Sequence, residues 1–153
     1  MLRDGPIPVF VHGVIEYLAG IFLIAAPLLL GYDSGAATAV SVIVGVVVLV
    51  VAAMTEGPTG LIPQLRLPAH VALDYVLAAL LIASPFLFGF TDEGAPTAVF
   101  IALGVVHLLV TIGTRFVTPD GADAASSGPD VSPRGRRRLG RRRARGEDTF
   151  PPS

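Results

Sequence analysis

Long apolar runs alternate with short polar stretches over the first 116 residues of the chain. The first apolar run covers residues 9–30, and three more cover about 36–54, 69–90 and 96–116. Because an α-helix rises 1.5 Å per residue, about 20 residues are enough to cross a hydrocarbon core of about 30 Å. The pattern therefore predicts an all-α membrane protein with four transmembrane helices.

The first and third apolar runs are copies of one another. Residues 12–31 return as residues 70–89, and the match goes on past one extra residue to pair Thr55 with Thr114. Apolar residues align by chance in such segments, but a shared register of polar and special residues does not. The matched residues include His12 and His70, Tyr17 and Tyr75, Pro27 and Pro85, and Gly31 and Gly89.

Such a duplication indicates two tandem helical hairpins, and it divides the chain. We expect a cytoplasmic leader (1–8), a first repeat (9–58), a cytoplasmic loop (59–68), a second repeat (69–116) and a tail (117–153). Each repeat crosses the membrane twice, so both copies enter from the same side. The repeats are therefore expected to be parallel and related by a pseudo-two-fold axis along the membrane normal.

Proline and glycine mark the same place in both copies. Pro27 and Pro85 lie one turn before the ends of their helices, and Gly31 and Gly89 follow four residues later. Proline removes one backbone hydrogen bond from a helix, and Ser84 is expected to satisfy a freed carbonyl.

Charge gives the orientation. All eleven basic residues are arginine; Arg3, Arg66 and Arg115 lie at one end of the predicted helices, and the other eight are in the tail. The turns at the opposite end of the helices hold Asp33, Asp92 and Glu93 and no basic residue. The positive-inside rule thus predicts a plasma-membrane protein with both termini in the cytoplasm. Arginine without lysine, beside much Ala, Gly, Val and Pro, indicates a GC-rich bacterial genome, and the lack of cysteine excludes disulfides and thiolate sites.

The tail is rich in Gly, Pro, Ser, Asp and Arg and is predicted to be disordered. No aromatic residue interleaves its arginines, so we expect no binding of nucleic acid. Beside a membrane, each arginine would gain about 1 kcal/mol from anionic lipid head groups. The alternative is a pure orientation signal. The cluster comprises Arg134, Arg136, Arg137, Arg138, Arg141, Arg142, Arg143 and Arg145.

Two pairs of ionisable residues lie within the predicted spans. His12 and Glu16 are four residues apart, as are His70 and Asp74, so each pair shares one helix face. The pseudo-two-fold axis is expected to bring the pairs together. Imidazole with carboxylate suits Zn, Fe, Mn or Ni, and the same groups can pass protons. The alternative is a structural clasp in which each acid binds its own histidine or a neighbouring helix.

Three further polar residues in the spans are less informative. Tyr17 and Tyr75 are expected to anchor near the interface, or to donate to a carboxylate of the neighbouring helix. His107 matches Val48 of the first copy and so breaks the repeat. A lone histidine on an apolar helix is expected to bond a backbone carbonyl.

The stretch around Ser84-Pro85-Phe86, with His70 and Asp74 before it and a second copy in Ala26-Pro27-Leu28, resembles the SPW-repeat family of integral membrane proteins. Phe86 and Leu28 stand where that family has tryptophan. The resemblance covers about residues 8–116. It implies a multi-pass membrane protein without an established activity and assigns no catalytic residue.

The chain holds no nucleophile triad, phosphate loop or dinucleotide fingerprint, so we predict neither an enzyme nor a cofactor. The favoured function is a membrane scaffold or interaction module. The alternative is a small proton- or metal-coupled protein built on His12, Glu16, His70 and Asp74. Four helices make a thin pathway, so transport would call for a homo-oligomer.

Overall fold

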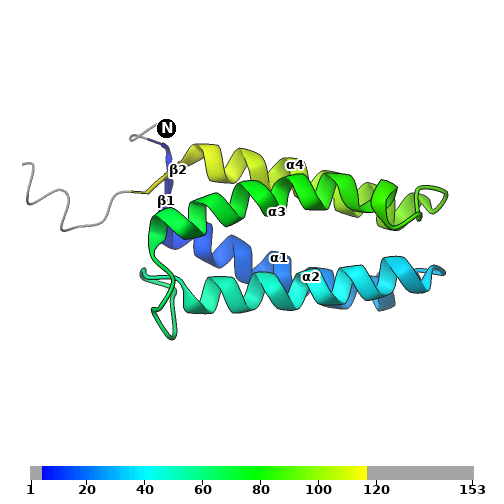
Figure 1. Ribbon diagram of the computed structural model, residues 1–153, viewed down its shortest axis with the longest axis horizontal. Coiled ribbons are helices and arrows are strands. Elements are labelled where there is room, and N and C mark those ends of the chain that lie inside the picture. Colours follow the sequence, from blue (N-terminus) through cyan, green and yellow to red (C-terminus); the bar gives the residue numbers. More distant parts are fainter. Residues whose placement is uncertain (1–4, 117–153) are drawn as a thin grey trace, which may run out of the picture. The chain divides into compact units, whose positions relative to one another are not determined.

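Figure 1 shows a computed structural model of the protein, which describes residues 5–116. Four helices follow one another: α1 (Val9–Leu30), α2 (Gly35–Met54), α3 (Leu67–Leu87) and α4 (Gly94–Gly113). Each is long and apolar enough to cross a membrane. The four predicted helices are thus confirmed. Most of the predicted leader, the whole predicted tail and its arginine cluster lie outside the described residues.

The repeated proline and glycine residues determine where α1 and α3 end. Gly31 and Gly89 adopt the left-handed conformation, with φ of 62° and 68°. This conformation lets the amides of Tyr32 and Phe90 return to the carbonyls of Pro27 and Pro85, at 3.1 and 3.0 Å. Helix α3 therefore ends at Leu87, three residues earlier than predicted.

The two prolines are accommodated differently. Pro27 frees the carbonyl of Leu23, and Ser41 of α2 donates its hydroxyl to that oxygen at 2.6 Å. The expectation for Ser84 is wrong, because its hydroxyl donates to Leu80 at 2.7 Å, whereas the carbonyl four residues before Pro85 belongs to Leu81. Phe100 stands at the position that matches Ser41 and carries no donor.

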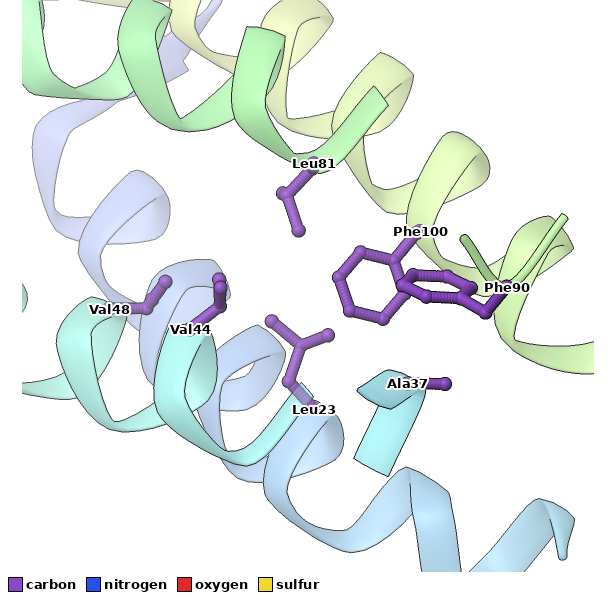
Figure 2. Close-up of a cluster of buried hydrophobic side chains, with 7 residues drawn as sticks. All are labelled: Leu23, Ala37, Val44, Val48, Leu81, Phe90 and Phe100. Atoms are coloured by element: carbon purple, nitrogen blue, oxygen red, sulfur yellow. The ribbon is translucent and has the colours of Figure 1, made fainter. Parts of the chain in front are cut away.

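The two helices of each hairpin approach one another most closely at small residues. A Cβ atom on Gly45 of α2 would lie 2.8 Å from the Gly20 carbonyl of α1, and one on Gly104 would lie 3.0 Å from the Ala78 carbonyl of α3. The hairpins then pack on one another through a buried apolar cluster to which all four helices contribute (Figure 2). Its members are Leu23, Ala37, Val44, Val48, Leu81, Phe90 and Phe100.

Both turns within the hairpins lie at one end of the bundle, and the α2–α3 loop lies at the other with two short strands (Figure 1). Strand β1 (Ile7–Pro8) pairs in parallel with β2 (Thr114–Arg115), and Ile7 faces Thr114. A matched bridge joins Thr55 to Leu65. The start of each repeat is thus paired with the end of the other. The sequence predicted neither strand, and α4 ends at Gly113 rather than near residue 116.

Candidate metal centre

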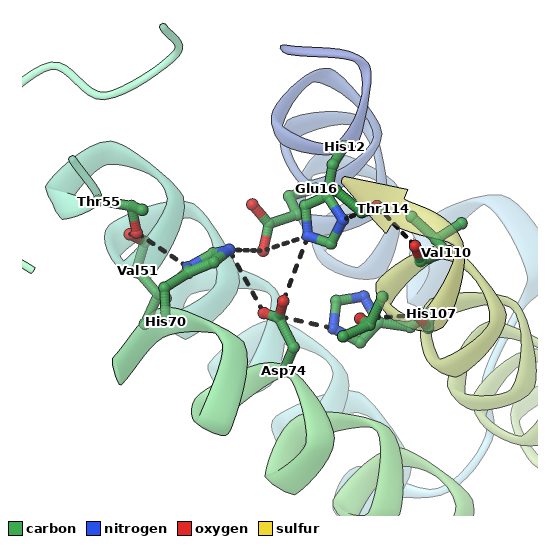
Figure 3. Close-up of polar contacts among 10 residues, drawn as sticks. His12, Glu16, Val51, Thr55, His70, Asp74, His107, Val110 and Thr114 are labelled. Carbon is green, nitrogen blue, oxygen red and sulfur yellow. Dashed lines mark hydrogen bonds and ion pairs between the residues drawn. The ribbon is translucent and has the colours of Figure 1, made fainter. Parts of the chain in front are cut away.

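The two ionisable pairs meet between α1 and α3, near the end of the bundle that carries the strands (Figure 3). The i, i+4 spacing points His12 and Glu16 from one face of α1, and His70 and Asp74 from one face of α3. All four are buried, with exposed fractions of 1–3%. The sequence-predicted residues therefore form one cluster in the described part of the chain.

Each histidine touches both acids. His12 Nε2 lies 3.3 Å from Asp74 Oδ2 and 3.7 Å from Glu16 Oε1. His70 Nε2 lies 3.4 Å from Glu16 Oε1 and 3.5 Å from Asp74 Oδ1. One ligand atom from each of the four residues lies within 4.8 Å of all the others. The contacts across the repeats are thus shorter than those within each repeat for His12, and nearly equal to them for His70.

Two threonines orient the imidazole rings. Thr55 Oγ1 lies 2.9 Å from His70 Nδ1, and Thr114 Oγ1 lies 2.9 Å from His12 Nδ1. Each hydroxyl already donates its single hydrogen to a helix carbonyl, Thr55 to Val51 and Thr114 to Val110, both at 2.6 Å. The threonine oxygens must therefore accept from the Nδ1–H groups. In the neutral tautomer, both Nε2 atoms then present lone pairs to the carboxylates.

Some polar atoms of the cluster are left without a partner. His12 Nε2 and Asp74 Oδ2 are buried and make no hydrogen bond among the described residues. Two buried carboxylates beside two neutral imidazoles would leave an uncompensated charge of −2. Buried charge of this kind is costly unless a cation or protons balance it.

A family model for the SPW repeat domain matches residues 10–114. The chain belongs to the SPW repeat family. The match spans both hairpins and includes His12, Glu16, His70 and Asp74. No curated protein and no solved structure matches the chain. Together with the four apolar helices, the SPW repeat makes this a multi-pass membrane protein, and the family is not a known family of enzymes.

The nitrogen–oxygen contacts in the cluster of this SPW repeat protein are close to those of a four-coordinate metal site, although the cluster as a whole is somewhat wider. Zinc binds histidine nitrogen and carboxylate oxygen at about 2.0–2.2 Å, so the edges of its coordination tetrahedron are about 3.3–3.6 Å. The four nitrogen–oxygen contacts run from 3.3 to 3.7 Å and use both oxygens of Asp74, and one ligand atom from each residue lies within 4.8 Å of the other three. A dication would also balance the two carboxylates. Histidines that bind metals donate their other ring N–H to a second group, as both rings do here to threonine.

Sequence reasoning missed three residues of this SPW repeat centre. Thr55 and Thr114 were matched as repeat partners, but their role depends on a contact with the other hairpin. His107 of α4 lies 3.7 Å from Asp74 Oδ1, and its Nε2 has no hydrogen-bond partner among the described residues. It is therefore a neighbour of Asp74, a contact that the mismatch with Val48 of the first repeat gave no reason to expect.

The tyrosines take different positions. Tyr17 donates its hydroxyl to the Thr59 carbonyl at 3.1 Å and so ties the α2–α3 loop to α1. Tyr17 therefore donates to a backbone carbonyl and not to a carboxylate, and it does more than anchor the helix near the interface. Tyr75 is exposed on the surface of α3, with 39% of its area accessible, where an anchoring role remains a prediction.

Proposed function

We propose that this protein is a membrane protein that binds a divalent transition-metal ion between its two hairpins. The observation that supports this most strongly is the convergence of two histidine nitrogens and two carboxylates, buried, with both rings oriented by threonine. The ligands are His12, Glu16, His70 and Asp74. We call these four residues the quartet.

A structural clasp would need both imidazoles to be protonated on both nitrogens, whereas a metal ion needs only neutral rings. In a clasp, each Nε2 would carry a hydrogen toward a carboxylate. The threonines instead draw the ring hydrogen to Nδ1, because their own hydrogens point at the Val51 and Val110 carbonyls. A neutral clasp would therefore set lone pairs against lone pairs at 3.3–3.7 Å. A shared dication turns that repulsion into coordination.

The donor set favours zinc and its neighbours among the divalent metals. Imidazole suits Zn, Cu, Fe and Ni, whereas Mg and Ca prefer sites made of oxygen alone. The chain has no cysteine to offer soft thiolate ligands to Cu(I). We take Zn²⁺ as the expected ion and Co²⁺ as its spectroscopic substitute.

The first test is the metal content of the full chain, purified in detergent without chelator and measured by elemental mass spectrometry. We expect close to one zinc ion per chain. The double variant His12→Ala/His70→Ala should lose it while keeping its helical circular dichroism and its elution volume. Tyr75→Phe, a change on the exposed surface of α3, serves as the control and should keep the ion.

Co²⁺ gives a second readout. Loaded into the quartet, it should show the intense visible absorption of a tetrahedral site, which the double variant should lack. If the wild-type chain holds no metal even after incubation with Zn²⁺ or Co²⁺, the proposal is overturned. Protons would then balance the quartet, and the scaffold role predicted from the sequence would become the working function.

The arginine pattern supports a plasma-membrane orientation in which the quartet lies toward the cytoplasm. Arg66 and Arg115 flank the end of the bundle that holds the quartet, whereas Asp33, Asp92 and Glu93 follow the opposite ends of α1 and α3. Both termini would then be cytoplasmic. Contact of the arginine cluster at 134–145 with anionic lipid, and assembly into a homo-oligomer, remain predictions.

A further inference from the structure

A small depression, with room for about one water molecule, reaches three of the four quartet residues near the α2–α3 loop. His12, Glu16 and His70 are among the residues that line it. Glu56 and Thr59 of the loop line it as well, together with Phe116. The depression therefore brings the surface of the bundle closest to these three ligands, on the side away from the apolar core.

The two halves of this mouth differ in charge, although the repeats are related by pseudo-symmetry. Glu56 follows Thr55, and Arg115 follows Thr114, so the two occupy matched positions. Both are exposed, but only Glu56 is among the residues that line the depression. A cation is attracted on the Glu56 side and repelled on the Arg115 side.

The halves also differ in bulk. Gly57 and Phe116 are the next matched pair. The Phe116 ring packs edge-on against the His12 imidazole, with the ring centroids 5.3 Å apart. A Cβ atom on Gly57 would meet nothing nearer than Val9, at 3.9 Å. The side of the mouth next to Glu56 is thus left open by the glycine, while the other is covered by an aromatic ring.

The loop that carries Glu56 is fixed to the bundle. The Glu56 amide donates to the Leu65 carbonyl at 2.8 Å, and Tyr17 holds the Thr59 carbonyl. Gly13 of α1 makes room for this arrangement, since a Cβ atom there would overlap the Thr59 hydroxyl. The matched residue in the second repeat is Val71. The backbone that carries Glu56 is thus fixed beside the depression.

We propose that Glu56 is an entry ligand, a carboxylate that captures a divalent cation at the mouth and passes it to the quartet. This inference rests on the proposed function, because it requires that the quartet bind a metal. Glu56 is not one of the four ligands. It therefore sets how fast the ion enters and leaves, and not how tightly it is finally held.

The test is the rate of metal loading into the full chain in detergent, after the metal has been stripped with a chelator. Stopped-flow mixing with Co²⁺ would follow the visible absorption of the tetrahedral site. We expect Glu56→Gln to load about tenfold more slowly, within the range by which a charged cleft raises association rates. Its stoichiometry and its Kd from chelator competition should match those of the wild type within about twofold.

Two variants serve as controls. Glu56→Asp keeps the charge and should restore most of the wild-type rate. Arg115→Gln neutralises the matched residue of the other half, and it should not slow loading. Equal rates for the wild type and Glu56→Gln would overturn the entry role while leaving the metal centre intact. Absence of binding in every variant, the wild type included, would instead overturn the proposed function and this inference with it.

Discussion

At the scale of single residues, the threonines that follow α2 and α4 determine how the two imidazole rings of the quartet are oriented. Each has one hydroxyl hydrogen, and each uses it on a helix carbonyl, which leaves the oxygen to accept from a histidine. That choice fixes the tautomer and the direction of Nε2. The short side chains of Thr55 and Thr114 thereby decide which atoms of the rings face the carboxylates.

Replacing Thr114 by valine should weaken metal binding with little change in fold. The substitution keeps the shape and removes the acceptor for His12 Nδ1–H, and loss of such outer partners lowers metal affinity by about 10–100-fold. Chelator competition would measure the Kd. Thr111→Val is the matched control, because Thr111 makes the same kind of bond to a helix carbonyl, that of His107, but does not touch a quartet ring. An equal loss in both variants would contradict the orienting role.

The four quartet residues could be predicted because their evidence is local. The i, i+4 spacing sets the face of each helix, and the duplication implies an axis that relates the faces. His107 could not be found in that way, since its partner Asp74 lies on another helix and its repeat position holds Val48. Contacts between elements depend on rotation and depth, which an apolar helix pattern leaves open.

At the scale of helices, lengths were predictable and ends were less so. Helix α1 has the predicted bounds because an apolar run of about 20 residues must satisfy its backbone internally within a membrane. Helix α3 stops early since Gly89 turns left-handed, and α4 gives way to β2 because Ile7 is there to pair with it. A strand of two residues depends on a partner more than 100 positions away and leaves no periodic signal.

The glycine contacts within each hairpin predict a stability effect. Gly45→Ala places a methyl group 2.8 Å from the Gly20 carbonyl and beside Ile24, both of which would have to move. Overpacking of this kind costs about 1–3 kcal/mol. Thermal unfolding in detergent would show a lower midpoint than for the wild type. Gly35→Ala is the control, because a Cβ atom there meets nothing within 4 Å. Equal midpoints for the two variants would rule out close packing at Gly45.

At the scale of the whole molecule, the repeats complete each other. The start of the first repeat pairs with the end of the second, and the bridge from Leu65 to Thr55 repeats that arrangement in reverse. His12 likewise bonds Thr114, and His70 bonds Thr55. Neither hairpin by itself contains an imidazole with its orienting threonine. The centre is therefore a property of the docked pair, and a metal ion would hold the hairpins together at that end.

This arrangement predicts that metal tightens one end of the bundle and not the other. Hydrogen exchange of the full chain should slow with Zn²⁺ at the Glu56 and Leu65 amides, which bond across the loop next to the quartet. Amides near chain connections exchange through local opening, so a ligand that bridges the hairpins there reduces that opening. The Tyr32 and Phe90 amides, which cap α1 and α3 at the far end, should exchange unchanged.

The same comparison in His12→Ala/His70→Ala separates bridging from general effects of the ion. The double variant should show no difference with and without Zn²⁺ at either end. Equal protection at both ends of the wild-type chain would mean that the ion stabilises the bundle as a whole and does not act mainly by bridging the hairpins at the quartet. Protection confined to the loop and lost with the two histidines would instead show that the duplicated hairpins are locked together by the ion that they share.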